Sequence, residues 1–142
     1  MKSRLLLLFV LLLGASLLLA ACGGGETAAP AADEIDVSTL APEIDVETAR
    51  SVQDSPDVFM LDVREPYEYE EGHIPGITLI PMNEIPARVG EIPTDKQVIV
   101  TCRTGNRSAQ VVDFLREQGF TNVHNMDGGI VAWQDAGYPV EQ

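Results

Sequence analysis

Cys102 and the polar residues that follow it are the part of this chain whose types and spacing could do chemistry. A short apolar run, 98–100, leads into the loop, whose residues are Cys102, Arg103, Thr104, Gly105, Asn106, Arg107 and Ser108. A thiol placed between a strand and a helix start meets converging backbone N–H groups and partial positive charge. Two arginines add to that charge, so the thiol pKa should fall below its free value of about 8.5. The stretch predicts an anion-binding pocket around a sulfur nucleophile.

The elements around the loop follow an alternating pattern. Apolar runs at 58–61 and 97–101 predict strands buried on both faces, and shorter strands are expected near Ile44, at 77–80 and near Val123. Helical patterns follow the strands. Such alternation predicts an α/β domain with a parallel sheet covered by helices on both faces. Ligands bind beyond the carboxyl ends of such strands, and both Asp62 and Cys102 are expected there.

Cap residues define the expected helix limits. Asn83 is the predicted N-cap of a helix over 84–89. Asn106 or Ser108 is the predicted N-cap of the helix after the loop, which Gly119 ends in a left-handed conformation.

The loop after Cys102 resembles the active-site loop of the rhodanese (sulfurtransferase) family. LDVREPYEYEEGHIPG at 61–76 looks like the first signature of that family, and MDGGIVAWQDAGYPV at 126–140 looks like its closing one. The resemblance covers roughly residues 43–140. It implies a three-layer α/β/α fold with a five-stranded parallel sheet, in one domain at 43–142.

The resemblance also implies a reaction. Cys102 would accept a sulfane sulfur as a persulfide and pass it to a second nucleophile. The expected substrates are a small anionic donor such as thiosulfate and a thiol or cyanide acceptor, with no cofactor. The substrate-binding residues would come from the loop: Arg103, Thr104, Gly105, Asn106, Arg107 and Ser108. Two alternatives stay open: Arg107 can fold back to brace the loop, and the small polar residues can brace and cap instead of binding.

Several other polar residues have structural interpretations. Asp62 and Arg64 match the acid and arginine of the first signature, and an ion pair that brackets adjacent loops is the expected role. His73 lies in a Gly-His-Ile-Pro-Gly turn that its ring can brace, and His124 is expected to be exposed or structural. Two histidines and one free thiol, widely spaced, do not form a recognisable metal-ligand set.

Two competing functions remain: a cysteine phosphatase or arsenate reductase on a similar loop, and a non-catalytic persulfide carrier or binding module. Four residues separate Cys102 from Arg107, whereas the rhodanese-fold phosphatases use five. The shorter loop predicts a cradle for one sulfur atom and not for a tetrahedral phosphate. A carrier would differ from an enzyme only in turnover.

The N-terminus has the pattern of a bacterial lipoprotein signal. Lys2 and Arg4 precede an apolar stretch at 5–19, and the sequence Leu-Ala-Ala-Cys ending at Cys22 resembles a lipobox. We expect residues 1–21 to be a signal peptide, and Cys22 to carry acyl chains such as palmitate. The protein would be extracytoplasmic and anchored to a bacterial membrane without a spanning helix. Residues 22–42, rich in Gly, Ala, Pro and acid, predict a flexible tether, with a short docked helix as the alternative.

The composition limits the partners. The formal net charge is −13 in 142 residues, which disfavours binding to nucleic acid or to anionic lipid headgroups. The chain has two cysteines, Cys22 and Cys102, and therefore no disulfide framework. A monomer is expected.

Overall fold

The computed structural model describes residues 35–142 and contains one five-stranded sheet. The predicted signal peptide, Cys22 and most of the predicted tether lie outside these residues. The strands are β1 (Glu43–Ile44), β2 (Val58–Asp62), β3 (Thr78–Leu79), β4 (Gln97–Thr101) and β5 (Val123–Met126). All pairings are parallel, in the order β1-β5-β4-β2-β3. The predicted five-stranded parallel sheet is confirmed.

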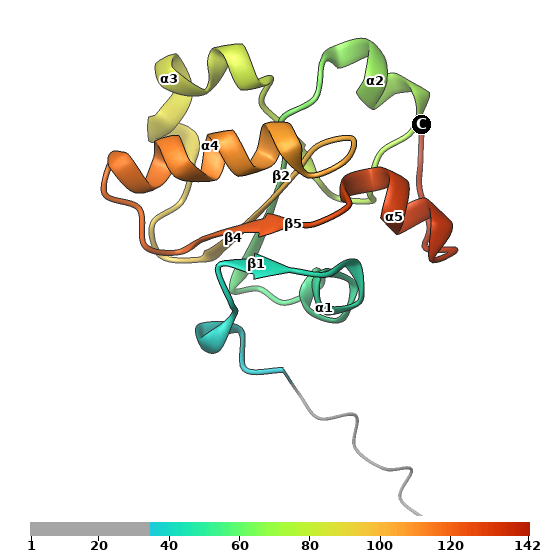
Figure 1. Cartoon of the computed structure of the whole chain (residues 1–142), viewed down its shortest axis with the longest axis horizontal. Helices are drawn as coiled ribbons and strands as arrows, with labels where there is room; N and C mark the ends of the chain where they lie inside the picture. Colours follow the sequence, from blue (N-terminus) through green and yellow to red (C-terminus); the bar gives the residue numbers. More distant parts are fainter. Residues whose placement is uncertain (1–34) are drawn as a thin grey trace, which may run out of the picture. The chain divides into compact units, whose positions relative to one another are not determined.

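Helices cover both faces of this sheet. They are α1 (Val46–Val52), α2 (Pro66–Glu71), α3 (Ile85–Arg88), α4 (Asn106–Glu117) and α5 (Gly129–Asp135), with short 3-10 turns at Val37–Thr39, Met82–Glu84 and Val89–Glu91. Residues of α3 and α4 share one apolar cluster with the strands, and residues of α1 and α5 share a second. In Figure 1, α3 and α4 lie on one side of the strands and α1 lies on the other. Within residues 35–142, no helix has the length and apolarity to cross a membrane.

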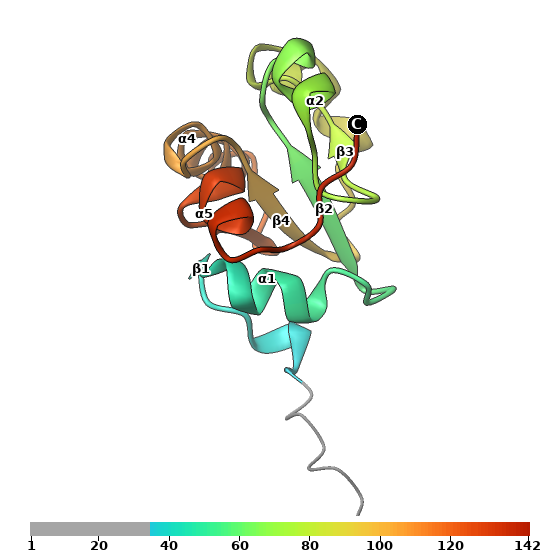
Figure 2. The same cartoon turned by 90° about the vertical axis from the view of Figure 1, so that its right-hand side faces the viewer.

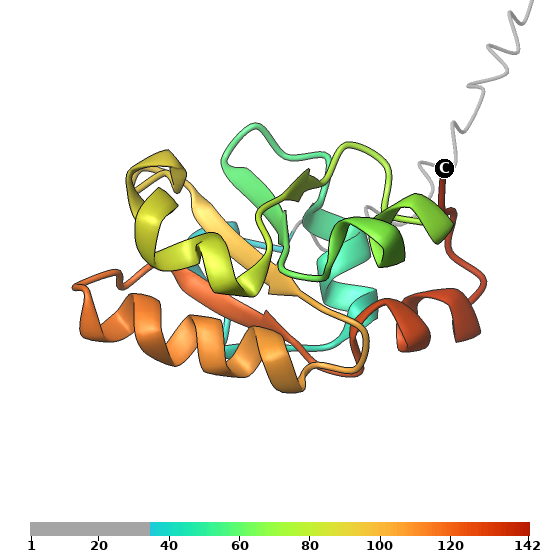
Figure 3. The same ribbon diagram turned by 90° about the horizontal axis from the view of Figure 1, so that it is seen from above.

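The strand register sets the position of the site. Val98, Ile99 and Val100 of β4 are all fully buried, because both faces of this strand are covered. Asp62, the last residue of β2, pairs in register with Thr101, the last residue of β4. The two strands therefore end level, and the residues after them meet at one edge of the sheet. Figure 3 shows α2 and α5 beside the loop that leads into α4 at this edge.

The predicted N-caps of two helices are wrong. Asn83 lies inside a 3-10 turn, and Glu84 precedes α3 without a side-chain cap hydrogen bond. The N-cap of α4 is Gly105, with φ 93° in the left-handed region, and not Asn106 or Ser108. The left-handed turn is favourable for glycine alone among the loop residues. Ser108 is not the cap, and its hydroxyl lies 3.4 Å from the Cys102 sulfur.

The folded part begins before the predicted boundary at residue 43. Val37 and Leu40 pack against the apolar cluster under α1 and α5. The carbonyl of Ala41 lies 2.6 Å from Nδ1 of His124, and the carbonyl of Pro42 accepts the backbone N–H of Asn125 at 3.0 Å. Residues 37–42, at the C-terminal end of the predicted tether over 22–42, therefore contact the folded domain through apolar side chains and backbone carbonyls.

Candidate active site

The thiol of Cys102 lies just beyond the end of β4, at the carboxyl edge of the sheet. The residue is 1% exposed. The backbone N–H of Gly105 donates to its Sγ at 3.2 Å, and the Ser108 hydroxyl lies 3.4 Å from the same sulfur. The left-handed turn at Gly105 bends the chain back, so that this N–H points at the sulfur. Two donors therefore converge on the Cys102 sulfur itself.

The cradle determines the charge state of the thiol. Burial by itself disfavours the thiolate and would raise the pKa of Cys102. Hydrogen bonds from Ser108 and from the backbone N–H groups of Thr104 and Gly105 outweigh burial, so the pKa lies below its ordinary value. The lowered pKa agrees with the sequence-based expectation, and the hydrogen bonds from the loop are the causes that lower it.

We expect Ser108→Ala to raise the pKa of Cys102, because the substitution removes a hydrogen bond that favours the thiolate. The thiolate would then form at a higher pH, and the acid limb of any thiolate-dependent rate would move upward by up to about one pH unit. Thiolate absorbance in the ultraviolet, titrated against pH with Cys102→Ser as the blank, measures this shift. An unchanged titration curve would mean that the hydroxyl donates to the Gly105 carbonyl, 3.0 Å away, and not to the sulfur.

The two arginines of the loop have different surroundings. Arg103 is exposed and makes no ion pair within residues 35–142. Arg107 forms a bidentate ion pair with Glu68 of α2, and both N–O distances are 2.7 Å. Arg107 therefore ties the start of α4 to α2 in this structure. Glu68 was missed by sequence reasoning, because nothing in the alternating Tyr-Glu-Tyr-Glu stretch separates it from Glu70.

Asp62 and Arg64 form the expected bracket. Asp62 is fully buried and accepts Arg64 Nη2 at 2.7 Å and Nε at 2.9 Å. Arg64 also donates to the carbonyls of Glu68 and Gly72, at 3.0 and 2.9 Å. One arginine thus fixes both α2 and the turn after it to the end of β2. Both residues support the site without touching the thiol.

The two histidines have structural roles. Nδ1 of His73 lies 3.0 Å from the carbonyl of Tyr69, and its ring stacks on the Tyr69 ring at 3.7 Å. This contact braces the turn, as predicted. Burial lowers the pKa of His124, whose ring nitrogens contact Ala41 and Gln97. No three His, Cys, Asp or Glu side chains in residues 35–142 are grouped so as to hold a metal ion.

Thr104 and Asn106 lie on the outer side of the loop, and both are exposed. The Asn106 amide donates to the Thr104 hydroxyl at 3.4 Å, the only side-chain contact that joins these two residues. Their side chains therefore face solvent, and only the backbone of Thr104 contributes to the thiolate.

A second loop packs directly on the cysteine loop. The backbone N–H groups of Ile130 and Val131 donate to the carbonyls of Cys102 and Arg103, at 2.9 and 3.1 Å. In Figure 2, α5 and the start of α4 lie side by side at this place. The contact is possible because Gly129 has no side chain: a Cβ there would lie 2.5 Å from the Cys102 oxygen and 2.6 Å from the Arg103 carbonyl.

We expect Gly129→Ala to reduce the free energy of unfolding by about 2–4 kcal/mol, from backbone strain and overpacking together. The φ of Gly129 is +58°, so the new side chain would be strained as well as crowded. Gly90→Ala is the control, since a Cβ at Gly90 meets nothing within 4 Å. Urea denaturation of both variants measures the difference. Equal stabilities would contradict the close approach of the two loops.

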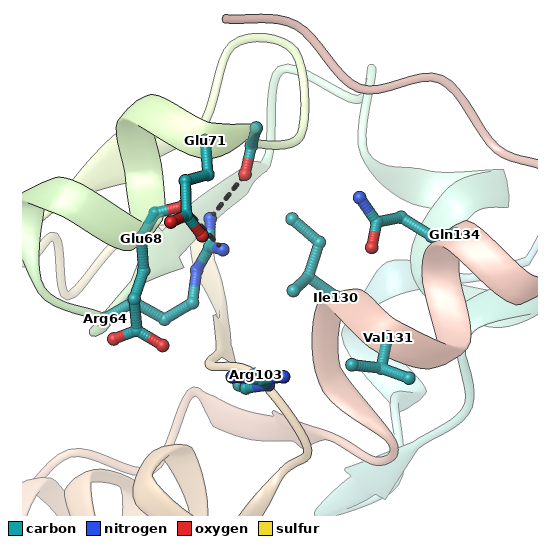
Figure 4. Close-up of a pocket in the computed structure, with 8 residues that line it drawn as sticks. Arg64, Glu68, Glu71, Arg103, Ile130, Val131 and Gln134 are labelled. Atoms are coloured by element: carbon teal, nitrogen blue, oxygen red, sulfur yellow. Dashed lines mark hydrogen bonds between the residues drawn. The ribbon is translucent and has the colours of Figure 1, made fainter.

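A cavity of about 160 Å³ opens between α2 and α5 next to the loop. Its lining consists of Arg64, Glu68, Glu71, Gly72, Arg103, Ile130, Val131 and Gln134. Figure 4 shows the α2 side with Arg64 and Glu71, the α5 side with Ile130 and Gln134, and Arg103 between them. Arg64 is already paired with Asp62, so Arg103 is the cation in this wall that remains open to an anion.

Comparison with known proteins assigns the family. A family model described as a rhodanese-like domain matches residues 45–136. A sulfurtransferase of Allochromatium vinosum is 42% identical over 99 residues, which cover 69% of this chain and 92% of that protein. The thiosulfate sulfurtransferase GlpE of Pseudoalteromonas translucida is 39% identical over 83 residues, which cover 58% of this chain and 79% of that protein.

Solved structures agree with this assignment. The crystal structure of a rhodanese-related protein from Thermoplasma volcanium superposes with a TM-score of 0.66 at 35% identity. The superposition covers 71% of this chain and 98% of that one. The chain belongs to the rhodanese-like domain family, and its relatives include named sulfurtransferases.

Proposed function

We propose that the protein is a sulfurtransferase that carries sulfane sulfur as a persulfide on Cys102. The observation that carries this proposal is the hydrogen-bonded cradle that favours the Cys102 thiolate beyond the end of β4. The thiolate attacks the outer sulfur of thiosulfate and forms an S–S bond, while the S–S bond of the donor breaks. Sulfite leaves with the electron pair. An acceptor thiolate or cyanide then attacks the bound sulfur, and the Cys102 thiolate leaves.

The residues around the thiol suit a small sulfur group. Because Cys102 is 1% exposed, only a narrow sulfur-terminated group can approach its Sγ. The oxyanion part of a donor would remain in the cavity beside Arg103, whose charge has no protein partner in the described residues. The other loop residues shape the backbone around the sulfur.

Two features favour sulfur transfer over phosphate hydrolysis. Four residues separate Cys102 from Arg107, so fewer N–H groups are available for the three oxygens of a phosphate. Asp62 is a poor candidate for the general acid, since both of its oxygens accept hydrogen bonds from Arg64.

Mass measurement after incubation with thiosulfate tests the proposal. We expect a gain of one sulfur atom that maps to Cys102, and cyanide should remove it with formation of thiocyanate. Absence of the gain would overturn the persulfide mechanism. A gain that cyanide and thiols discharge only once, without turnover, would indicate a carrier instead of an enzyme. Efficient hydrolysis of aryl phosphates would indicate the phosphatase.

We also propose that the domain acts outside the cytoplasm, held to a membrane by acyl chains on Cys22. The support is the sequence pattern of residues 1–22, with a short apolar stretch ending in Leu-Ala-Ala-Cys. Mass measurement of the mature N-terminus in a bacterial host tests this proposal. An acylated Cys22 is expected, and Cys22→Ser should abolish acylation; an unmodified N-terminus at another residue would refute the anchor.

A further inference from the structure

Glu68 occupies both terminal nitrogens of the Arg107 guanidinium. Its two carboxylate oxygens each accept one terminal nitrogen of Arg107 at 2.7 Å, the geometry of a bidentate pair. The side chain of Glu68 is 10% exposed and that of Arg107 is 32% exposed. The terminal nitrogens that a donor oxyanion would use are thus already occupied by a carboxylate.

Glu68 is itself fixed in place. One of its carboxylate oxygens accepts the backbone N–H of Glu65 at 3.0 Å, as part of the capping box that starts α2. The carbonyl of Glu68 accepts Arg64, which is paired with buried Asp62. The carboxylate therefore cannot swing aside without losing its hydrogen bond from the Glu65 N–H, which is part of the α2 capping box. Displacement of Glu68 by a donor would cost more than displacement of a freely rotating surface carboxylate.

Arg107 nevertheless interacts electrostatically with the Cys102 thiolate. Its ion pair with Glu68 is the main cause that raises the pKa of Arg107, and the negative charge of Cys102 contributes in the same direction. The hydrogen bond from Arg107 likewise holds the pKa of Glu68 at about 2. Glu68 therefore stays ionised near neutral pH, and protonation does not open the pair there.

We infer that Glu68 is a positioning residue that sets donor specificity: by engaging Arg107 it limits the attraction of the site for doubly charged sulfur donors. This inference rests on the proposed sulfur transfer. With Arg107 engaged, Arg103 is the one unpaired positive charge beside the cavity among residues 35–142. One cation favours a singly charged donor. The favoured class is therefore a monoanionic sulfane donor, such as a thiosulfonate or an organic persulfide, over the thiosulfate dianion.

Glu68→Gln tests the inference in the full chain. Glutamine keeps an oxygen for the Glu65 N–H but loses the charge that holds Arg107. The two donors to compare are thiosulfate and methanethiosulfonate, which offer the same sulfonyl-bound sulfur and differ by one charge. We expect the ratio of their kcat/KM values to shift toward thiosulfate by about 3- to 10-fold, through a lower KM for thiosulfate. Added salt should reduce this shift.

Two further variants separate a specificity role from other causes. Glu70→Gln makes the same charge change on the same helix at an exposed position outside the cavity lining, and should leave the ratio within about twofold of wild type. Glu68→Gln combined with Arg107→Ala should lose the gain, because the freed guanidinium is then absent.

The ratio of kcat/KM values in these variants decides whether Glu68 sets donor specificity. An unchanged ratio in Glu68→Gln, or equal losses with both donors together with lower thermal stability, would overturn the inference and leave Glu68 a structural brace. A gain that persists without Arg107 would also overturn it. The wild-type mass gain on Cys102 is measured in the same series. Its absence would refute sulfur transfer itself, whereas its presence with an unchanged ratio would refute only the role of Glu68.

Discussion

Cys102→Ser is expected to lower kcat/KM for sulfur transfer by more than about 10³-fold, with no persulfide detectable by mass. A serine hydroxyl at this position cannot act as the sulfur nucleophile, because its pKa is far above that of a thiol. Within residues 35–142, Cys102 is the one cysteine. No neighbouring thiol in the described domain could take over the reaction.

The same substitution should preserve the fold. The Gly105 N–H and the Ser108 hydroxyl can both bond to a serine oxygen, so we expect a stability change within about 1 kcal/mol. Thermal unfolding of wild type and variant is the control. Activity of a well-folded Cys102→Ser within tenfold of wild type would place the chemistry elsewhere.

Asp62→Asn is expected to cost about 3–5 kcal/mol of unfolding free energy, the largest stability effect among the substitutions considered. Asp62 is 0% exposed and Arg64 is 4% exposed. The substitution leaves the Arg64 charge buried without its carboxylate, and an uncompensated buried charge is strongly unfavourable. Arg64 also holds the carbonyls of Glu68 and Gly72, so α2 should loosen as well. Urea denaturation measures the loss.

Asp54→Asn is the matched control for this prediction. Asp54 pairs with Arg50 at 3.2 Å, but its side chain is 80% exposed. Loss of this pair should cost less than about 1 kcal/mol, since water solvates both groups. Similar losses at the two positions would show that the burial of the Asp62–Arg64 pair contributes nothing.

Cys102 and the buried Asp62–Arg64 pair contribute to the same site in different ways. Cys102 would carry the reaction, and the Asp62–Arg64 pair keeps α2 where Glu68 can reach Arg107. A change in the buried pair should therefore affect donor selection as well as stability. A change at Cys102 should affect only the reaction.

Periodicity and local chemistry determined most of the fold. Strands with one solvent-exposed face alternate apolar and polar residues, whereas the apolar runs of β2 and β4 are continuous. A parallel sheet covered on both faces therefore followed from the residues alone. The left-handed Gly119 after α4 and the proline at the start of α2 were also local signals. Such features depend on backbone conformation and on neighbours in sequence, which a sequence shows directly.

The helix caps and the N-terminal boundary could not be obtained in this way. Asn106 and Ser108 are both good caps in isolation, yet Gly105 takes that position, because the chain must turn back over the Cys102 sulfur. Val37 and Leu40 look unremarkable in a polar stretch. They are half-buried because the apolar cluster under α1 and α5 offers a surface nearby, and that surface exists only after folding.

The sequence by itself determined the candidate nucleophile, the loop length and the sheet edge on which the thiol lies. Only the tertiary structure decided which arginine of the loop is paired with a carboxylate and which faces solvent. Arg103 and Arg107 are equivalent in type and flank the same loop, but one faces solvent while the other is held by Glu68, 39 residues away in the chain. The partner of a long, flexible side chain is set by distances across the fold. Spacing along the sequence does not contain those distances.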